Sequence, residues 1–287
     1  MSKILKLNFP DFELAWEGMN ELLANNEEEI KSGGYGDIYG TEMTLYNAFI
    51  YVEKATLRDD FDFGKILGYK YKKWSKLVSN YVDLNYLDLV KSEVLSREKK
   101  LSTNTSYNYT FHFDNSHGSG KDCLISLTFQ RRIGESTPII IFTTRASEAT
   151  KRLVFDFLLL QRITEYVYGK GVKVKALLYI PFMYINVESF LIYAGYKGLD
   201  KVVIPHGGKY TPFQERILKR FEEFTHKPLS EIKYKVHRRA AAQIQKDKSG
   251  EPLSKSPSLL AKDLVLEKPI KVGLKTLENL NKGITIK

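Results

Sequence analysis

The chain has 287 residues, of which 43% are hydrophobic, so it is long and apolar enough for one large domain with a sizeable core. Its single cysteine, Cys123, excludes an internal disulfide, and no apolar stretch is long enough for a membrane span. The formal net charge of +10 favours an anionic partner, such as a phosphorylated metabolite, a nucleic acid or an acidic protein.

The N-terminal part of the sequence mixes helical and extended patterns. Apolar residues at helical spacing predict a helix over 12–31, and a glycine-rich loop at 32–37 leads into a predicted strand at 37–45. A second helix is predicted at 81–95, and alternating aromatic residues predict a strand at 102–113. The glycine-rich loop lacks the Lys-Ser/Thr pair of a P-loop, and the sequence contains no Rossmann fingerprint.

The central part predicts two paired strands followed by a long helix. Apolar runs at 124–129 and 139–142 flank a polar turn, a pattern typical of paired strands. A long helix is predicted over 148–168. The remaining predicted elements are a strand at 176–185, a helix at 187–194, a strand at 202–205 and a helix at 212–224. This order indicates an α+β fold rather than a regular βαβ alternation.

Composition changes towards the C-terminus. Beyond residue 242 the chain is rich in lysine, serine and proline, which is typical of a linker or an extended arm. We therefore expect one domain over residues 1–241 and a basic Lys/Ser/Pro-rich arm over 242–287. The arm is a candidate for nucleic-acid contact, although basic segments of this kind are more often simply solvated.

The two predicted strands in the central part carry two residues suited to covalent chemistry. Cys123 opens the first strand and Arg145 follows the second, so the thiol and the guanidinium can lie close together. A thiolate beside a phosphate-binding arginine suits covalent chemistry on a nucleotide. A lone cysteine is also commonly a small buried hydrophobe, and an arginine at a strand end is commonly solvated. The residues alone leave both interpretations open.

Seven short segments carry a further signal through their order. They are residues 36–43, 68–74, 96–99, 123, 144–148, 155–157 and 182–186. In order and spacing they resemble the motifs of the thymidylate synthase superfamily, nearest to the phage-type deoxycytidylate or deoxyuridylate hydroxymethylases. The resemblance covers residues 15–195 and leaves the C-terminal third unmatched.

The resemblance implies a fold and a reaction. The fold would be a thymidylate synthase-like mixed sheet packed with helices, which dimerises through the sheet. The reaction would transfer a one-carbon unit to C5 of dCMP or dUMP, by hydroxymethylation or methylation, with 5,10-methylenetetrahydrofolate as cofactor. Cys123 would add as a thiolate to C6 of the pyrimidine. With no signal-peptide pattern and no membrane span, we expect a cytoplasmic protein, in the host cytoplasm if the chain is phage-encoded.

The resemblance also assigns site residues. Asp156 occupies the base-reading position, where a carboxylic acid can donate to cytosine N3 and accept from its amino group, so Asp156 would be a second catalytic residue and favours dCMP. Tyr184 would bind the sugar, and Trp74 would line the cofactor pocket. The remaining substrate-binding residues would be Arg145 and Ser147 in one subunit and Arg97 or Lys99 from its partner. Core packing or a local ion pair explains several of these residues equally well.

Departures from the family pattern favour a second interpretation. Leu124, Ala146 and Phe182 replace the histidine, serine and histidine that the resemblance would lead us to expect, and Glu98 replaces an arginine. A catalytically inactive thymidylate synthase-like protein that binds nucleotide or nucleic acid is therefore the alternative. An unrelated basic α+β protein that binds nucleic acid is the third possibility.

Overall fold

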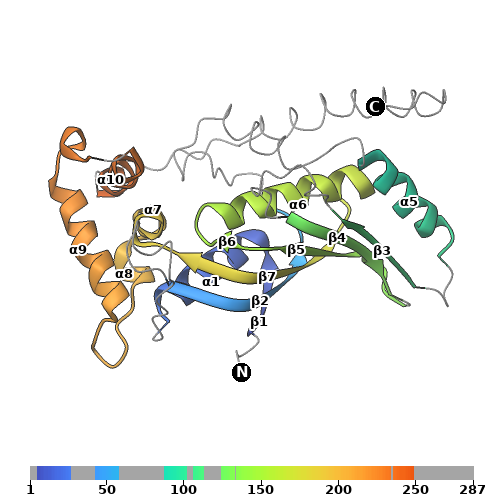
Figure 1. Ribbon diagram of the computed structural model, residues 1–287, viewed down its shortest axis with the longest axis horizontal. Helices are drawn as coiled ribbons and strands as arrows, with labels where there is room; N and C mark the ends of the chain where they lie inside the picture. The colour runs from blue at the N-terminus through green and yellow to red at the C-terminus, as the bar shows by residue number, and fades with distance from the viewer. Residues whose placement is uncertain are drawn as a thin grey trace.

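The protein is built on a mixed sheet packed with helices, as seen in a computed structural model (Figure 1). The structure describes residues 5–26, 43–57, 87–101, 106–112, 124–132, 134–233 and 235–248. The strands of the sheet run in the order β1-β2-β7-β5-β4-β3, and the short strand β6 (Ser147–Glu148) pairs with β7. The longer strands are β1 (Leu5–Asp11), β2 (Met43–Lys54), β3 (Tyr107–His112), β4 (Leu124–Arg131), β5 (Ile139–Thr144) and β7 (Lys175–Ile185).

The helices fall into two groups around this sheet (Figure 1). The first group, α1 (Phe12–Ala24), α5 (Leu87–Lys99) and α6 (Arg152–Tyr168), packs along the sheet. The second group lies beyond the end of the sheet that β7 reaches. Its members are α7 (Val187–Lys197), α8 (Leu199–Val202), α9 (Pro212–His226), the 3₁₀ helix η1 (Leu229–Glu231) and α10 (Lys235–Lys248).

The core lies between the sheet and α1 and α6. The rings of Phe12 and Phe157 stack with centroids 4.4 Å apart, and both side chains are fully buried. The indole of Trp16 donates to the carbonyl of Thr150 across 2.9 Å, so α1 is held at the beginning of α6. Burial of a large aromatic side chain is worth roughly 2–3 kcal/mol, and these contacts therefore fix α6 firmly on the sheet.

The opposite face of the sheet is rich in aromatic side chains. Leu178 and Ile180 are fully buried on the core side, so the alternate residue Tyr179 points to the other face. There the Tyr179 ring stacks on Phe49 at 4.6 Å, and its hydroxyl donates to the side chain of Asn47, a residue with φ of 56°. Tyr46, on β2, is 41% exposed.

The coarse prediction of an α+β protein is confirmed, and several details of the predicted elements are wrong. The predicted strand at 202–205 is absent because residues 199–202 form α8 and the following residues are irregular. The first helix ends at Ala24, before the expected residue 31, and β1 was not predicted.

The expected boundary after residue 241 falls inside α10, and the arm residues beyond 248 lie outside the described ranges. Among the described residues, no helix is long and apolar enough to cross a membrane.

Candidate functional site

The candidate site lies near one end of the sheet. The carboxyl end of β7 meets the first residues of β2 and the short strand β6, and β5 ends a few residues earlier, where Thr143 pairs with Tyr179. Thr44 pairs with Tyr184, and Glu148 pairs with Tyr184 from the other side. The strands therefore bring Arg145, Ser147 and Tyr184, which the family resemblance assigned to the substrate, towards the same end of the sheet.

A buried serine–aspartate pair connects this end of the sheet to α6. The hydroxyl of Ser147 donates to Oδ2 of Asp156 across 2.7 Å, and the two residues are only 2% and 7% exposed. Burial raises the pKa of Asp156 to about 7, against the smaller opposing effects of the Ser147 hydrogen bond and the nearby Arg152 charge. Asp156 is therefore a carboxyl group that exchanges its proton near neutral pH.

Glu148 sets the position of that pair in a way the sequence did not predict. Its carboxylate accepts hydrogen bonds from the backbone N–H groups of Thr150, at 3.2 Å, and Lys151, at 2.7 Å. Lys151 precedes α6 and provides no side-chain cap of its own. Glu148 thus satisfies N–H groups at the start of the helix that carries Asp156. The sequence pattern placed Glu148 as the first residue of the predicted helix at 148–168, whereas α6 begins only at Arg152.

Arg145 and Tyr184 lie near the same end of the sheet as this pair. Ser147 pairs with Met183, which is fully buried, so the next residue of β7, Tyr184, points to the other face. Arg145 follows the last residue of β5 and is exposed. Tyr184 is half-buried near the end of β7, with its ring centroid 5.6 Å from that of Phe182. Arg145 offers an exposed guanidinium that can bind an anion, and Tyr184 offers a hydroxyl that can form hydrogen bonds.

Two predicted residues, Cys123 and Trp74, lie outside the described residues, so their assignments stay predictions. The pairing of the neighbouring strands is nevertheless relevant to Cys123. Leu124, the next residue, pairs with Thr144, the residue before Arg145. The expectation that β4 begins where β5 ends is therefore correct at these two positions.

Arg97 and Lys99 do not join this group within one chain. They lie in the last turn of α5, where Arg97 stacks over the ring of Tyr109 on β3 and approaches Glu93 at 3.6 Å. The adjacent Glu98 binds Arg131, the last residue of β4, whereas Leu124 lies at the opposite end of that strand. Any contribution of Arg97 or Lys99 to a phosphate site would have to come from a partner subunit.

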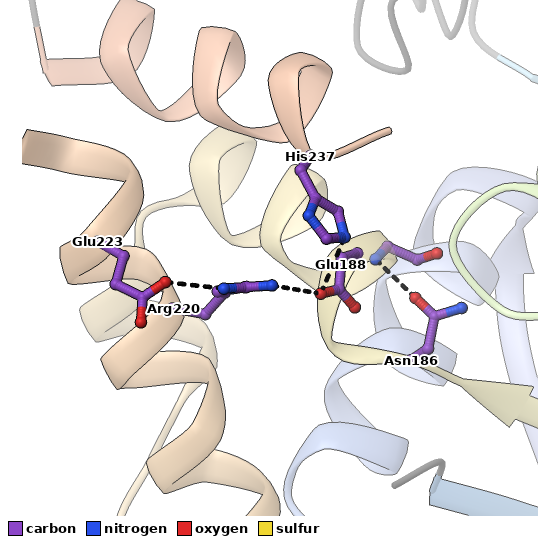
Figure 2. Close-up of polar contacts among 6 residues, drawn as sticks. Asn186, Glu188, Arg220, Glu223 and His237 are labelled. Atoms are coloured by element: carbon purple, nitrogen blue, oxygen red, sulfur yellow. Dashed lines mark hydrogen bonds and ion pairs between the residues drawn. The ribbon is translucent and has the colours of Figure 1, made fainter. Parts of the chain in front are cut away.

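A second polar cluster lies on the helices that follow β7 (Figure 2). Oε1 of Glu188 on α7 is 3.4 Å from Arg220 on α9 and 3.2 Å from Nε2 of His237 on α10. Arg220 also binds Glu223 at 2.7 Å. Burial lowers the pKa of His237, and the charges of Arg220 and Lys151 lower it further against the attraction of Glu188. This cluster joins three helices and was not predicted from the sequence.

The described residues contain no group of three or more His, Cys, Asp or Glu side chains arranged to hold a metal ion. No protein-family model matches the sequence, and no curated protein matches it.

Proposed function

We propose that this protein transfers a one-carbon unit to C5 of a pyrimidine deoxynucleotide, with dCMP as the preferred substrate and hydroxymethylation as the outcome. The single observation that supports this most strongly is the buried Ser147–Asp156 pair. A carboxyl group with a pKa of about 7 is protonated in a large fraction of molecules at neutral pH. Most surface carboxylates are ionised there and cannot donate a hydrogen bond.

The protonated form of Asp156 matches the edge of cytosine. Cytosine presents a ring nitrogen that accepts a hydrogen bond beside an amino group that donates one. A carboxylic acid presents the complementary donor and acceptor, and Ser147 fixes its orientation through Oδ2. Uracil presents a donor at the ring nitrogen and a carbonyl acceptor beside it, which a carboxylic acid can also match by exchanging the roles of its two oxygens. We propose that Ser147, by donating to Oδ2, keeps the proton on Oδ1 and so favours dCMP over dUMP.

The remaining assignments follow the family resemblance. We propose that Arg145, which is exposed, binds the 5′-phosphate, and that Tyr184 binds the sugar. We propose that the thiolate of Cys123 adds to C6, which makes C5 nucleophilic towards the one-carbon unit of the folate. Loss of the C5 proton then expels the folate amine, and water adds to the resulting methylene group as the thiolate leaves C6. No described residue is assigned to the folate, so the one-carbon donor stays a prediction from the family resemblance.

The aromatic face of the sheet supports the proposed homodimer. Phe49, Tyr179, Tyr46 and Phe182 form stacked or tilted pairs on the face away from the core. Large aromatic groups gathered on one side of a sheet favour burial against another surface. A second copy of the chain would supply that surface, and it would also bring a second α5 with Arg97 and Lys99.

One observation favours the alternative of an inactive binding protein. At the position where the resemblance implies an arginine for the partner's phosphate site, Glu98 instead binds Arg131 and Tyr107 of its own chain. That local pairing takes the place of one phosphate contact. An inactive protein would retain nucleotide binding through Arg145 without the transfer reaction.

The test is release of tritium from [5-³H]dCMP and [5-³H]dUMP, with and without methylenetetrahydrofolate. We expect release from dCMP with wild-type protein and none with Cys123→Ala, and Cys123→Ser provides a matched variant of nearly the same size. Release from dUMP alone would overturn the cytosine assignment. Binding of either nucleotide without any release, in folded protein, would establish the inactive alternative instead.

A further inference from the structure

The positive charge of the chain is concentrated in its last quarter. Residues 1–211 contain 27 lysines and arginines and 25 aspartates and glutamates, a net charge of only +2. The short stretch 212–248, which forms α9, η1 and α10, contains ten basic and five acidic residues, a net charge of +5. Half of the net charge of the protein therefore belongs to a folded part that the proposed chemistry does not use.

One face of α10 packs against α7 and α9. Ala240, Ala241 and Ile244 are fully buried, and the amide of Gln245 donates to the carbonyls of Phe224 and Lys227. His237 approaches Glu188 from the same side, as Figure 2 shows. These contacts define which face of the helix meets α7 and α9.

The helical positions on the opposite face of α10 are mostly occupied by basic residues. A helix advances 100° per residue, so positions 235, 239, 242 and 246 lie opposite the buried positions 240, 241 and 244. Lysine or arginine occupies three of these four positions. Arg238 borders this row and is exposed, and Lys233, just before the helix, is exposed as well. The only acidic residue of α10 is Asp247.

We propose that this face, named here the α10 basic face (Lys235, Arg238, Arg239 and Lys246), binds the phosphate backbone of double-stranded nucleic acid. Closely spaced cations on a rigid helix match the closely spaced phosphates of a duplex, and each phosphate contact releases counterions. The helix sequence contains no phenylalanine, tyrosine or tryptophan that could stack on unpaired bases. It also lacks the large apolar side chains with which a basic amphipathic helix enters a lipid surface.

The proposal is independent of the one-carbon chemistry, and it moves the expected nucleic-acid contact from the C-terminal arm to a folded helix. Binding is expected to be insensitive to base sequence and strongly weakened by salt, because backbone contacts carry no sequence information. Duplex DNA is expected to bind better than a single strand of the same length.

The experiment measures binding of full-length protein to a short mixed-sequence DNA duplex by fluorescence anisotropy over a series of salt concentrations. The test variant is Lys235→Glu/Arg238→Glu/Arg239→Glu. These substitutions lie in the first turns of α10, where acidic side chains favour the helix, so the fold is expected to persist. The control variant, Lys170→Glu/Lys173→Glu/Lys201→Glu, changes the net charge equally at exposed positions on other elements.

We expect the α10 variant to lose at least about 10-fold in affinity and to show a salt slope lower by about two to three, whereas the control variant stays near wild type. Equal losses in both variants, or no binding by wild type, would overturn the proposal. Binding to phosphatidylserine vesicles without binding to DNA would identify a membrane surface instead. Tritium release from dCMP, measured on the same α10 variant, tests the proposed enzyme separately.

Discussion

Asp156, which is buried, and His237, which is partly buried, make an informative comparison because desolvation moves their pKa values in opposite directions. Asp156 has a neutral hydroxyl as its hydrogen-bond partner, and burial raises its pKa to about 7. His237 faces Glu188 but also Arg220 and Lys151, and its pKa is lowered. In both cases the neutral form of the buried group is favoured. The first environment retains a proton near neutral pH, and the second excludes one.

The largest expected effect comes from removing the acid. Asp156→Asn keeps the size of the side chain, but its amide can turn over and present its donor and acceptor in either order, so it no longer selects cytosine over uracil. We expect the preference for dCMP over dUMP in kcat/KM to fall by about 10-fold or more, through higher activity on dUMP. Steady-state kinetics on both nucleotides provide the measurement. An unchanged preference for dCMP would remove Asp156 from the base-reading role.

The same substitution should change how stability depends on pH. Between pH 4 and 7 the folded protein holds a proton on Asp156 that the unfolded chain has released, so stability falls as the pH rises through this range. The full effect is of the order of 4 kcal/mol. Urea unfolding of wild type and Asp156→Asn at pH 5 and pH 8 should give a smaller difference between the two pH values for the variant. If the variant loses as much stability between pH 5 and pH 8 as the wild type does, the raised pKa of Asp156 is contradicted.

How much of this could be predicted from the sequence depends on the range of the interactions. The α+β class, the β4–β5 pairing and the helix after β5 follow from local hydrophobic patterns, and the structure confirms them. The closeness of Ser147 and Asp156 was implied only by a family resemblance, because periodicity does not determine how β6 meets α6. Glu188, Arg220 and His237 are up to 49 residues apart, and no local pattern connects them.

The strands β1 and β2 show another reason why a sequence pattern fails to predict a strand. β1 pairs in parallel with β2, and the residues that separate them in sequence include α1. Buried and exposed residues alternate only in part along β2. Asn47 has a left-handed backbone conformation, and the alternation of buried positions shifts by one residue around it. An irregularity of this kind hides a strand from a search for strict alternation.

The His237 cluster should respond to pH with the opposite sign. Because its pKa is lowered in the folded protein, stability is fully present above the ordinary histidine value of 6.5 and is lost as the pH falls below it. His237→Gln should remove this loss while retaining a hydrogen-bond donor for Glu188, with an effect below about 1 kcal/mol at this partly exposed site. Amide hydrogen exchange of α10 at pH 5.5 and pH 7.5 provides the measurement. Acid-induced opening that persists in the variant would assign it to another group.

A further effect is expected from the hydrogen-bond partner of Asp156. The hydrogen bond from Ser147 lowers the pKa of Asp156 and so partly offsets the effect of burial. Ser147→Ala should therefore raise the pKa of Asp156 further and cost about 1 kcal/mol of stability. The pH at which dCMP turnover declines on the alkaline side should move upwards, because the carboxyl group keeps its proton to higher pH. Ser147→Thr retains the hydroxyl and should leave that pH near the wild-type value, and a downward shift in Ser147→Ala would contradict the role of the pair.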